Sequence, residues 1–233
     1  METKSEIACA WSGIAFCVVW GLGMAVIARY LPPTAPSLGA QEIAALYEQN
    51  RNLIRTGAIV MFIGNGFYLS FTAIVSIVMW RAGYQLWAAV QLLGGGIGAM
   101  APFVSTMFWT AAAFRPDRDP QVILALNDVA WLFAIMFTVP VFFQYLSVGI
   151  VGLMGKGDDA PWPRWVGYLS IWLAVVQQPA PLLTYFKTGP FAWDGLFGFW
   201  IPAMAFFTWI IVMVNVLLKS IRRHAEQQKP LAS

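Results

Sequence analysis

Apolar residues along this chain come in long blocks that are separated by short polar stretches. A helix needs about 20 mostly apolar residues to cross a bilayer, because each residue adds about 1.5 Å of rise. Six blocks reach this length, and they lie at about residues 7–30, 57–80, 84–114, 129–154, 165–186 and 196–218. The pattern predicts an all-α fold, a polytopic transmembrane bundle of about six spanning helices.

The composition supports this fold class. Hydrophobic residues make up 59% of the 233 residues and charged residues 11%, with a mean hydropathy of +0.66, whereas an ordinary soluble domain carries about a quarter charged residues. The apolar blocks leave no room for a soluble core, so residues 1–233 are predicted to form a single transmembrane domain with a polar cytoplasmic tail at 219–233. The net charge of +3 comes from scattered cations without a basic stripe, which argues against a nucleic-acid partner.

An even number of crossings places both termini on one side of the membrane. Lys and Arg mark the cytoplasmic side, and the terminal face carries eight of them against six on the outer face. The terminal face has Lys4, Arg81, Lys156, Arg164, Lys219, Arg222, Arg223 and Lys229, and the outer face has Arg29, Arg51, Arg55, Arg115, Arg118 and Lys187. The count predicts that both termini are cytoplasmic.

Both longer connections on the outer face are predicted to contain helix. Asp119 and Pro120 form an N-cap and first-turn pair, so a helix is expected to start there and run into the fourth span. In the first outer connection, apolar residues recur at helical spacing from Gln41 onward, at Ile43, Leu46, Tyr47, Leu53 and Ile54. This predicts an amphipathic helix that is continuous with the second span or sharply bent into it. Such a helix either packs one face on the bundle or the lipid interface, or docks a partner protein.

Groups that carry redox or acid–base chemistry are missing from the predicted spans. The one histidine, His224, lies in the tail, and no span contains a central Asp, Glu, Lys or Arg. Haem, copper and di-iron sites need inward-facing His, Cys or carboxylate ligands, and a proton relay needs ionisable residues within the membrane. The sequence therefore indicates no cofactor and no metal, and it argues against a proton-coupled pump.

Prolines inside the predicted spans mark places where helices are interrupted. Each proline lacks a backbone N–H and leaves one carbonyl short of its partner, which a membrane tolerates only where other groups satisfy that carbonyl. The spans contain Pro102, Pro140, Pro179, Pro181 and Pro202. The densest run extends from Gln177 to Pro181, so we expect the fifth helix to be interrupted at Gln178 to Pro181.

Uncharged amides near these interruptions are the candidate ligand-binding residues. The amides are Asn65, Gln144, Gln177 and Gln178, and the predicted apolar walls of the same cavity are Trp109 and Trp172. An amide that faces hydrocarbon without a partner is costly, so all four must face each other, water or a ligand. Discontinuous helices near the midplane are typical of transporter sites. The alternative is that the amides join helices through hydrogen bonds, the prolines give static kinks, and the deep tryptophans face lipid.

A glycine run in the third block predicts close helix contact. Gly94 and Gly98 have the spacing of small residues at helix interfaces. The contact lies either within the bundle or at a face between copies of the chain.

Three segments resemble an uncharacterised family of bacterial multi-span membrane proteins. They are PRWVGY at 163–168, FKTGPFAWDGLF at 186–197 and residues 115–131, and the likeness extends over the whole chain. The resemblance implies a location in the bacterial inner membrane and brings no activity and no binding residues with it.

Two functions follow from these patterns. The first is a membrane-embedded binding or transport component for an apolar or weakly polar small molecule, of the lipid, sterol or hydrocarbon class. The second is a non-catalytic accessory subunit that packs on a larger membrane complex. A membrane enzyme is a third class, but nothing in the sequence brings Asp128, Tyr185 and Asp194 together as a catalytic group. The expected partners are membrane lipids, an apolar ligand, and further copies of the chain or a larger complex.

Overall fold

A computed structural model of the chain describes residues 2–155, 157 and 160–228. In this part of the chain the regular structure is helical, without strands. The α-helices are α1 (Glu2–Gly21), α2 (Ala40–Arg81), α3 (Gln85–Gly98), α4 (Met100–Phe114), α5 (Pro120–Met136), α6 (Thr138–Met154), α7 (Arg164–Val176) and α8 (Ile201–Gln228). Shorter pieces are the π-helices η1 (Leu22–Ile27) and η4 (Leu196–Trp200) and the 3-10 helix η3 (Ala180–Tyr185).

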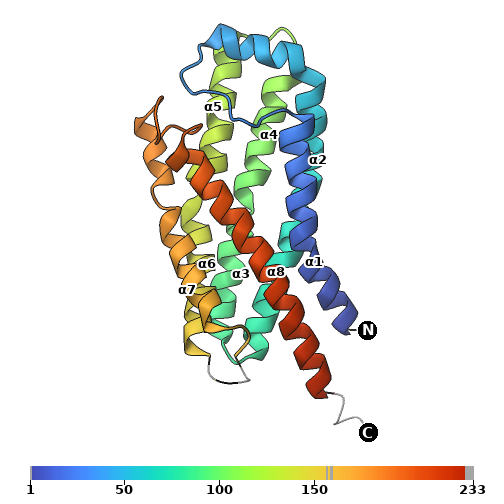
Figure 1. Cartoon of the computed structure of the whole chain (residues 1–233). Coiled ribbons are helices and arrows are strands. Elements are labelled where there is room, and N and C mark those ends of the chain that lie inside the picture. The colour runs from blue at the N-terminus through green and yellow to red at the C-terminus, as the bar shows by residue number, and fades with distance from the viewer. Residues whose placement is uncertain (1, 156, 158–159, 229–233) are drawn as a thin grey trace.

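These helices combine into six stretches that are long and apolar enough to cross a membrane, counted over the described residues. They are Thr3–Ile27, Ala40–Arg81, Gln85–Phe114, Pro120–Met154, Arg164–Tyr185 and Leu196–Gln227. Figure 1 shows them as an elongated bundle whose two chain ends lie at the same end of the molecule. The predicted helical bundle with an even number of long apolar helices is therefore present, and it indicates a multi-pass membrane protein.

The connection between the first two spans ends in the start of the longest helix of the structure, α2. The Glu42 carboxylate accepts a hydrogen bond of 2.7 Å from the backbone N–H of Gly39, which caps the start of α2. Ile43, Tyr47 and Ile54 are buried along this first part of the helix. Figure 1 shows it lying across the end of the bundle before α2 turns down along α1. The predicted helix is thus continuous with the second span and bent into it.

The fourth span starts where the sequence predicts. Asp119 precedes α5, and its side chain accepts a hydrogen bond of 2.7 Å from the backbone N–H of Gln121. Pro120 occupies the first helical position, where the missing N–H costs nothing. α5 runs into the fourth predicted span, and the helix breaks within that span at Phe137.

Glycines on α3 allow a close helix contact. A Cβ built on Gly94 would come within 2.7 Å of the Pro140 carbonyl oxygen, and one on Gly98 within 3.0 Å of the Val141 side chain. Both neighbours belong to α6, so the glycine face of α3 is covered inside the bundle. Of the two predicted alternatives, the structure shows the contact within one chain.

The end of the chain differs from the prediction in one respect. The first residues of the predicted tail, 219–228, continue α8 as helix. Residues 229–233 of that tail, including Lys229, lie outside the described residues, as does Lys156. At the same end of the molecule, Arg81 at the end of α2 pairs with Glu6 of α1.

Candidate functional site

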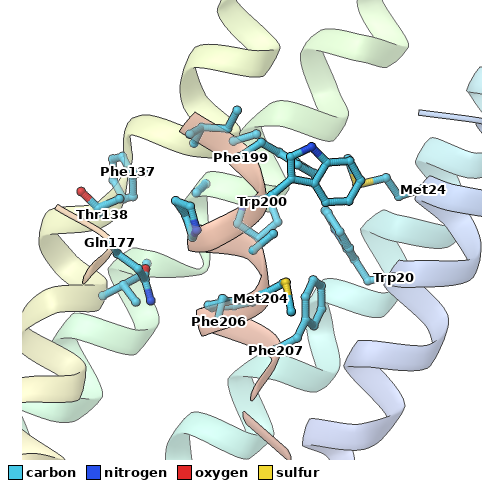
Figure 2. A pocket seen from close by; sticks show the side chains of 18 of the residues that line it. Trp20, Met24, Phe137, Thr138, Gln177, Phe199, Trp200, Met204, Phe206 and Phe207 are labelled. Atoms are coloured by element: carbon cyan, nitrogen blue, oxygen red, sulfur yellow. The ribbon is translucent and has the colours of Figure 1, made fainter. Parts of the chain in front are cut away.

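A cavity of about 410 Å³ that is open on one side lies between helices of the bundle, in contact with η4 and the first turns of α8. Its volume falls in the range of small-molecule sites, about 300–1,000 Å³. Phe16, Trp20, Phe199 and Trp200 are among its aromatic wall residues. Figure 2 shows labelled wall residues from α1, from the break between α5 and α6, from the residue after α7, and from η4 and α8. The cavity therefore joins segments that are distant in the sequence.

Two π-helical segments contribute to its wall. In η1 the wall residue is Met24, and in η4 the wall residues include Phe199 and Trp200. A π-helix widens the turn by one residue and interrupts the regular hydrogen-bond ladder. Such segments are rare in proteins and concentrate at functional sites.

Three further helix interruptions face the same cavity. The third span breaks at Ala99, beside the wall residue Gly98, and the fourth breaks at Phe137, which with Thr138 lines the cavity. The fifth span breaks at Gln177, the residue that follows α7, and Gln177 also lines the cavity. The predicted interruption of the fifth helix is thus confirmed.

The six spans differ in this respect. In the part of the chain that the structure describes, α2 runs as one uninterrupted α-helix, and it contributes no residue to the cavity wall. Three of the other spans break, at Ala99, Phe137 and Gln177, and the first and sixth each contain a π-helical segment at one end without a break. Each of these places has a wall residue in it or within two residues of it. The helix breaks and the π-helical segments of the bundle therefore lie next to the cavity.

Two prolines at these interruptions change the backbone chemistry of the wall. Pro102 and Pro202 both line the cavity. Neither can donate to the carbonyl four residues earlier, and these carbonyls belong to Gly98 and Gly198, which also line the cavity. The carbonyls of Gly98 and Gly198 therefore receive no helical hydrogen bond from the residue four positions later.

Polar side chains on the wall are few, and they include Thr138 and Gln177. Oγ1 of Thr138 is buried without a hydrogen-bond partner among the described residues, and Gln177 interacts with the buried hydroxyl of Tyr145. Buried polar atoms of this kind are exceptions in native structures and call for a cause such as a water molecule or a ligand. The described wall contains no Asp, Glu, Lys, Arg or His.

The candidate residue Gln144 lies elsewhere and has partners. Tyr68 donates a hydrogen bond of 2.7 Å to Oε1 of Gln144, and Nε2 of Gln144 donates one of 3.3 Å to Oγ1 of Thr72. These bonds join α6 to α2, as in the alternative in which the amides connect helices. Gln144 is not among the described wall residues.

Asn65 and Trp109 are buried away from the cavity wall. Both side-chain polar atoms of Asn65 lack a hydrogen-bond partner among the described residues. Trp109 packs its ring against Tyr30 and Trp131, at centroid distances of 4.9 Å and 5.1 Å. The ring centroids of Trp131 and the wall residue Phe199 are 6.1 Å apart. Trp109 is therefore separated from the cavity wall by Trp131.

Gln178 and Trp172 complete the set of predicted residues. Nε2 of Gln178 donates a hydrogen bond of 3.0 Å to the Ala174 carbonyl in the last turn of α7, and Gln178 is not a wall residue in the described part of the chain. Trp172 is 63% exposed on the outside of the bundle. Of the six candidates, the structure therefore brings Gln177 to the cavity and distributes the other five over other sites.

The sequence analysis missed most of the wall. Trp20, Met24 and Trp200 received no role there, because the two π-helical segments leave no mark in the hydrophobic period. The prolines were the usable signal, since Pro102 and Pro202 are themselves wall residues. Two of the five span prolines lie on the wall, whereas only Gln177 of the four amides does.

Comparison of the chain with models of known protein families, with curated proteins and with solved structures found no match. The function is therefore inferred from the residues of the cavity.

Proposed function

We propose that this protein is a bacterial inner-membrane component that binds or carries an apolar or weakly polar small molecule, of the lipid, sterol or hydrocarbon class, in the cavity. The observation that supports this proposal is that three broken spans and two π-helical segments meet at one cavity. Membrane transporters build their sites from such discontinuous helices, because irregular backbone inside a bilayer is tolerated where it lines a cavity.

The exterior of the bundle supports the membrane location. Leu86, Met204 and Trp172 are 71%, 67% and 63% exposed, and in water such side chains would be costly. In a bilayer they contact lipid tails, which are therefore the surrounding partner. The first part of α2 suits the lipid interface as the predicted amphipathic helix, and the charge count supports cytoplasmic termini.

The chemistry of the wall selects the class of ligand. Aromatic and aliphatic side chains dominate, and carboxylates and cations are missing from the described wall. An ion that entered this space would lose its hydration without gaining a counter-charge. A neutral, mostly apolar molecule loses nothing of that kind and gains dispersion contacts with the rings.

The accessory-subunit function has less support. It relied on the glycine face of the third span as a surface for another protein. Gly94 and Gly98 are covered by α6 within the same chain, so that face is already in use. The outer part of α2 is the remaining candidate surface for a larger complex.

The proposal is tested by filling the cavity. Ala203 lines it, and Ala203→Phe would place a ring in the space where the ligand is expected. The matched control is Val212→Phe, because Val212 is also a partly buried residue of α8 but is not a wall residue. The three proteins are purified in detergent, extracted with organic solvent and compared by mass spectrometry.

We expect at least one neutral apolar molecule to be enriched in extracts of the wild type and of V212F, and depleted in those of A203F. Identical extracts from all three proteins would overturn the proposal. Stoichiometric co-purification of another protein, without any such molecule, would favour the accessory-subunit function instead.

A further inference from the structure

We propose that a second pocket, at the end of the bundle that contains both chain ends, binds the anionic phosphate group of a membrane lipid. This basic pocket has a volume of about 530 Å³ and lies between Arg81 of α2, Pro161 of the α6–α7 connection, and Ser220, Arg223 and His224 of α8. Its described wall shares no residue with the wall of the cavity. The inference therefore does not depend on the proposed function.

The side chains of the basic pocket suit an anion. Arg81 at the end of α2 and Arg223 near the end of α8 border the same space, although they are far apart in the sequence. Both arginines are exposed, and the described wall contains no Asp or Glu. A guanidinium group presents its N–H donors in a planar fork that matches two oxygens of a phosphate.

Contacts within the fold hold both guanidinium groups at the pocket. Arg81 pairs with Glu6 of α1, which offsets part of its charge. Nη2 of Arg223 donates a hydrogen bond to the Ala160 carbonyl, just before Pro161 on the opposite wall. A neutral carbonyl orients the group without cancelling its charge, and an arginine has five N–H donors in all. Arg223 is therefore the principal cation that we assign to the phosphate.

The depth of the basic pocket favours a lipid over a soluble phosphate compound. The apolar part of α8, residues 201–218, is about 27 Å long, close to the thickness of about 30 Å of the hydrocarbon core. The wall residues of α8 follow directly after it, at the level of the headgroups. Trp80 and Trp165, which are 57% and 53% exposed at this end of the bundle, fit the aromatic belt at the same level. Figure 1 shows the ends of α2 and α8 at the end of the molecule that contains both chain ends.

The surroundings of the pocket also attract anions. At this end of the bundle the described residues include six Lys and Arg against three Glu, namely Lys4, Arg81, Arg164, Lys219, Arg222 and Arg223 against Glu2, Glu6 and Glu226. Basic pockets between spanning helices bind the headgroups of anionic lipids in membrane proteins. The lipid that fits is one with a net negative headgroup, such as phosphatidylglycerol.

The test compares four variants that each make the net charge more negative by one. Arg223→Gln and Ser220→Glu change the wall of the basic pocket. Arg222→Gln and Lys219→Gln are the matched controls, because both residues are exposed on the same turns of α8 and are not wall residues in the described part of the chain. Thermal unfolding in the same detergent checks that each variant is folded, and Ser220→Glu decides the test if the loss of the Ala160 contact unfolds Arg223→Gln.

The probes are dioleoyl phosphatidylglycerol and dioleoyl phosphatidylcholine, which have the same acyl chains and differ in headgroup charge. Native mass spectrometry of the purified protein gives the affinity for the first bound lipid of each kind. We expect the wild type to prefer phosphatidylglycerol, and this preference to fall about fivefold in R223Q and S220E, as for the loss of one cation at the headgroups. The preference should stay near the wild-type value in R222Q and K219Q.

Three results would overturn the inference. They are a wild type without this preference, an unchanged preference in R223Q and S220E, and an equal fall in all four variants, which would reflect general attraction to a cationic surface. A last arm uses glycerophosphoglycerol, the same headgroup without acyl chains. If it binds the wild type as tightly as the lipid does, the ligand is a soluble phosphate compound and the assignment to a lipid is wrong.

Discussion

The hydroxyl of Tyr68 donates a hydrogen bond of 2.7 Å to Oε1 of Gln144, and this contact joins α2 to α6 in the interior of the bundle. Both side chains are buried, at 1% and 0% exposure. Gln144→Leu removes the acceptor and leaves the Tyr68 hydroxyl buried without it. We expect the free energy of unfolding to fall by about 1–3 kcal/mol, measured by titration with a denaturing detergent in mixed micelles.

The same pair offers an internal control. Adding Tyr68→Phe to Gln144→Leu removes the stranded hydroxyl, so the double variant should lose less stability than the sum of the two single variants. Additive losses would show that the Tyr68–Gln144 bond carries no coupling energy.

The glycine face of α3 predicts a second stability difference. A Cβ on Gly94 would meet the Pro140 carbonyl oxygen at 2.7 Å and the Gln144 backbone nitrogen at 2.8 Å, whereas a Cβ on Gly96 meets nothing within 4 Å. Gly94→Ala should therefore destabilise the protein by about 1–3 kcal/mol through overpacking. Gly96→Ala should be neutral or slightly stabilising, because alanine favours the helix. Equal effects in the same titration would contradict the observed packing.

Access to the cavity predicts a kinetic effect. Met204 and Ile211 line the cavity and are 67% and 46% exposed, and Thr208 lies between them on the same face of α8. These residues edge the open side of the cavity, and that side faces lipid if α8 spans the membrane. Thr208→Trp should slow the exchange of tritiated 2-tetradecanone, an apolar ketone probe, about tenfold, which corresponds to about 1.4 kcal/mol of barrier. Asn215→Trp, which is exposed on α8 away from the described wall, should leave the exchange rate unchanged.

Orientation is tested by labelling from outside the cell. Cys9 and Cys17 are first replaced by alanine, and single cysteines are then placed at Asp117 or Glu226, both of which are exposed. We expect an impermeant maleimide to label D117C in intact cells and to label E226C only after the cells are opened. Labelling in the reverse order would place both termini outside.

The sequence by itself determined the features that depend on neighbouring residues. Long apolar blocks predicted the six stretches because the cost of burying polar groups in hydrocarbon acts on each block separately. Asp119 and Pro120 predicted a helix start, and the dense proline run predicted the break after α7, because caps and prolines act within one turn. These predictions needed no knowledge of which helices pack together.

Only the tertiary structure decided where the amides face and what they contact. Gln177 and Gln178 are chemically identical neighbours, and the turn that follows α7 gives them different surroundings. Gln144 has its partners on α2, which lies more than 70 residues earlier in the chain. The π-helical segments that contain Met24 and Trp200 could not be predicted from the apolar pattern, because one extra residue in a turn leaves no periodic trace in an apolar block. Local sequence therefore set where helices begin, break and end, and the packing of the bundle set which side chains share a cavity.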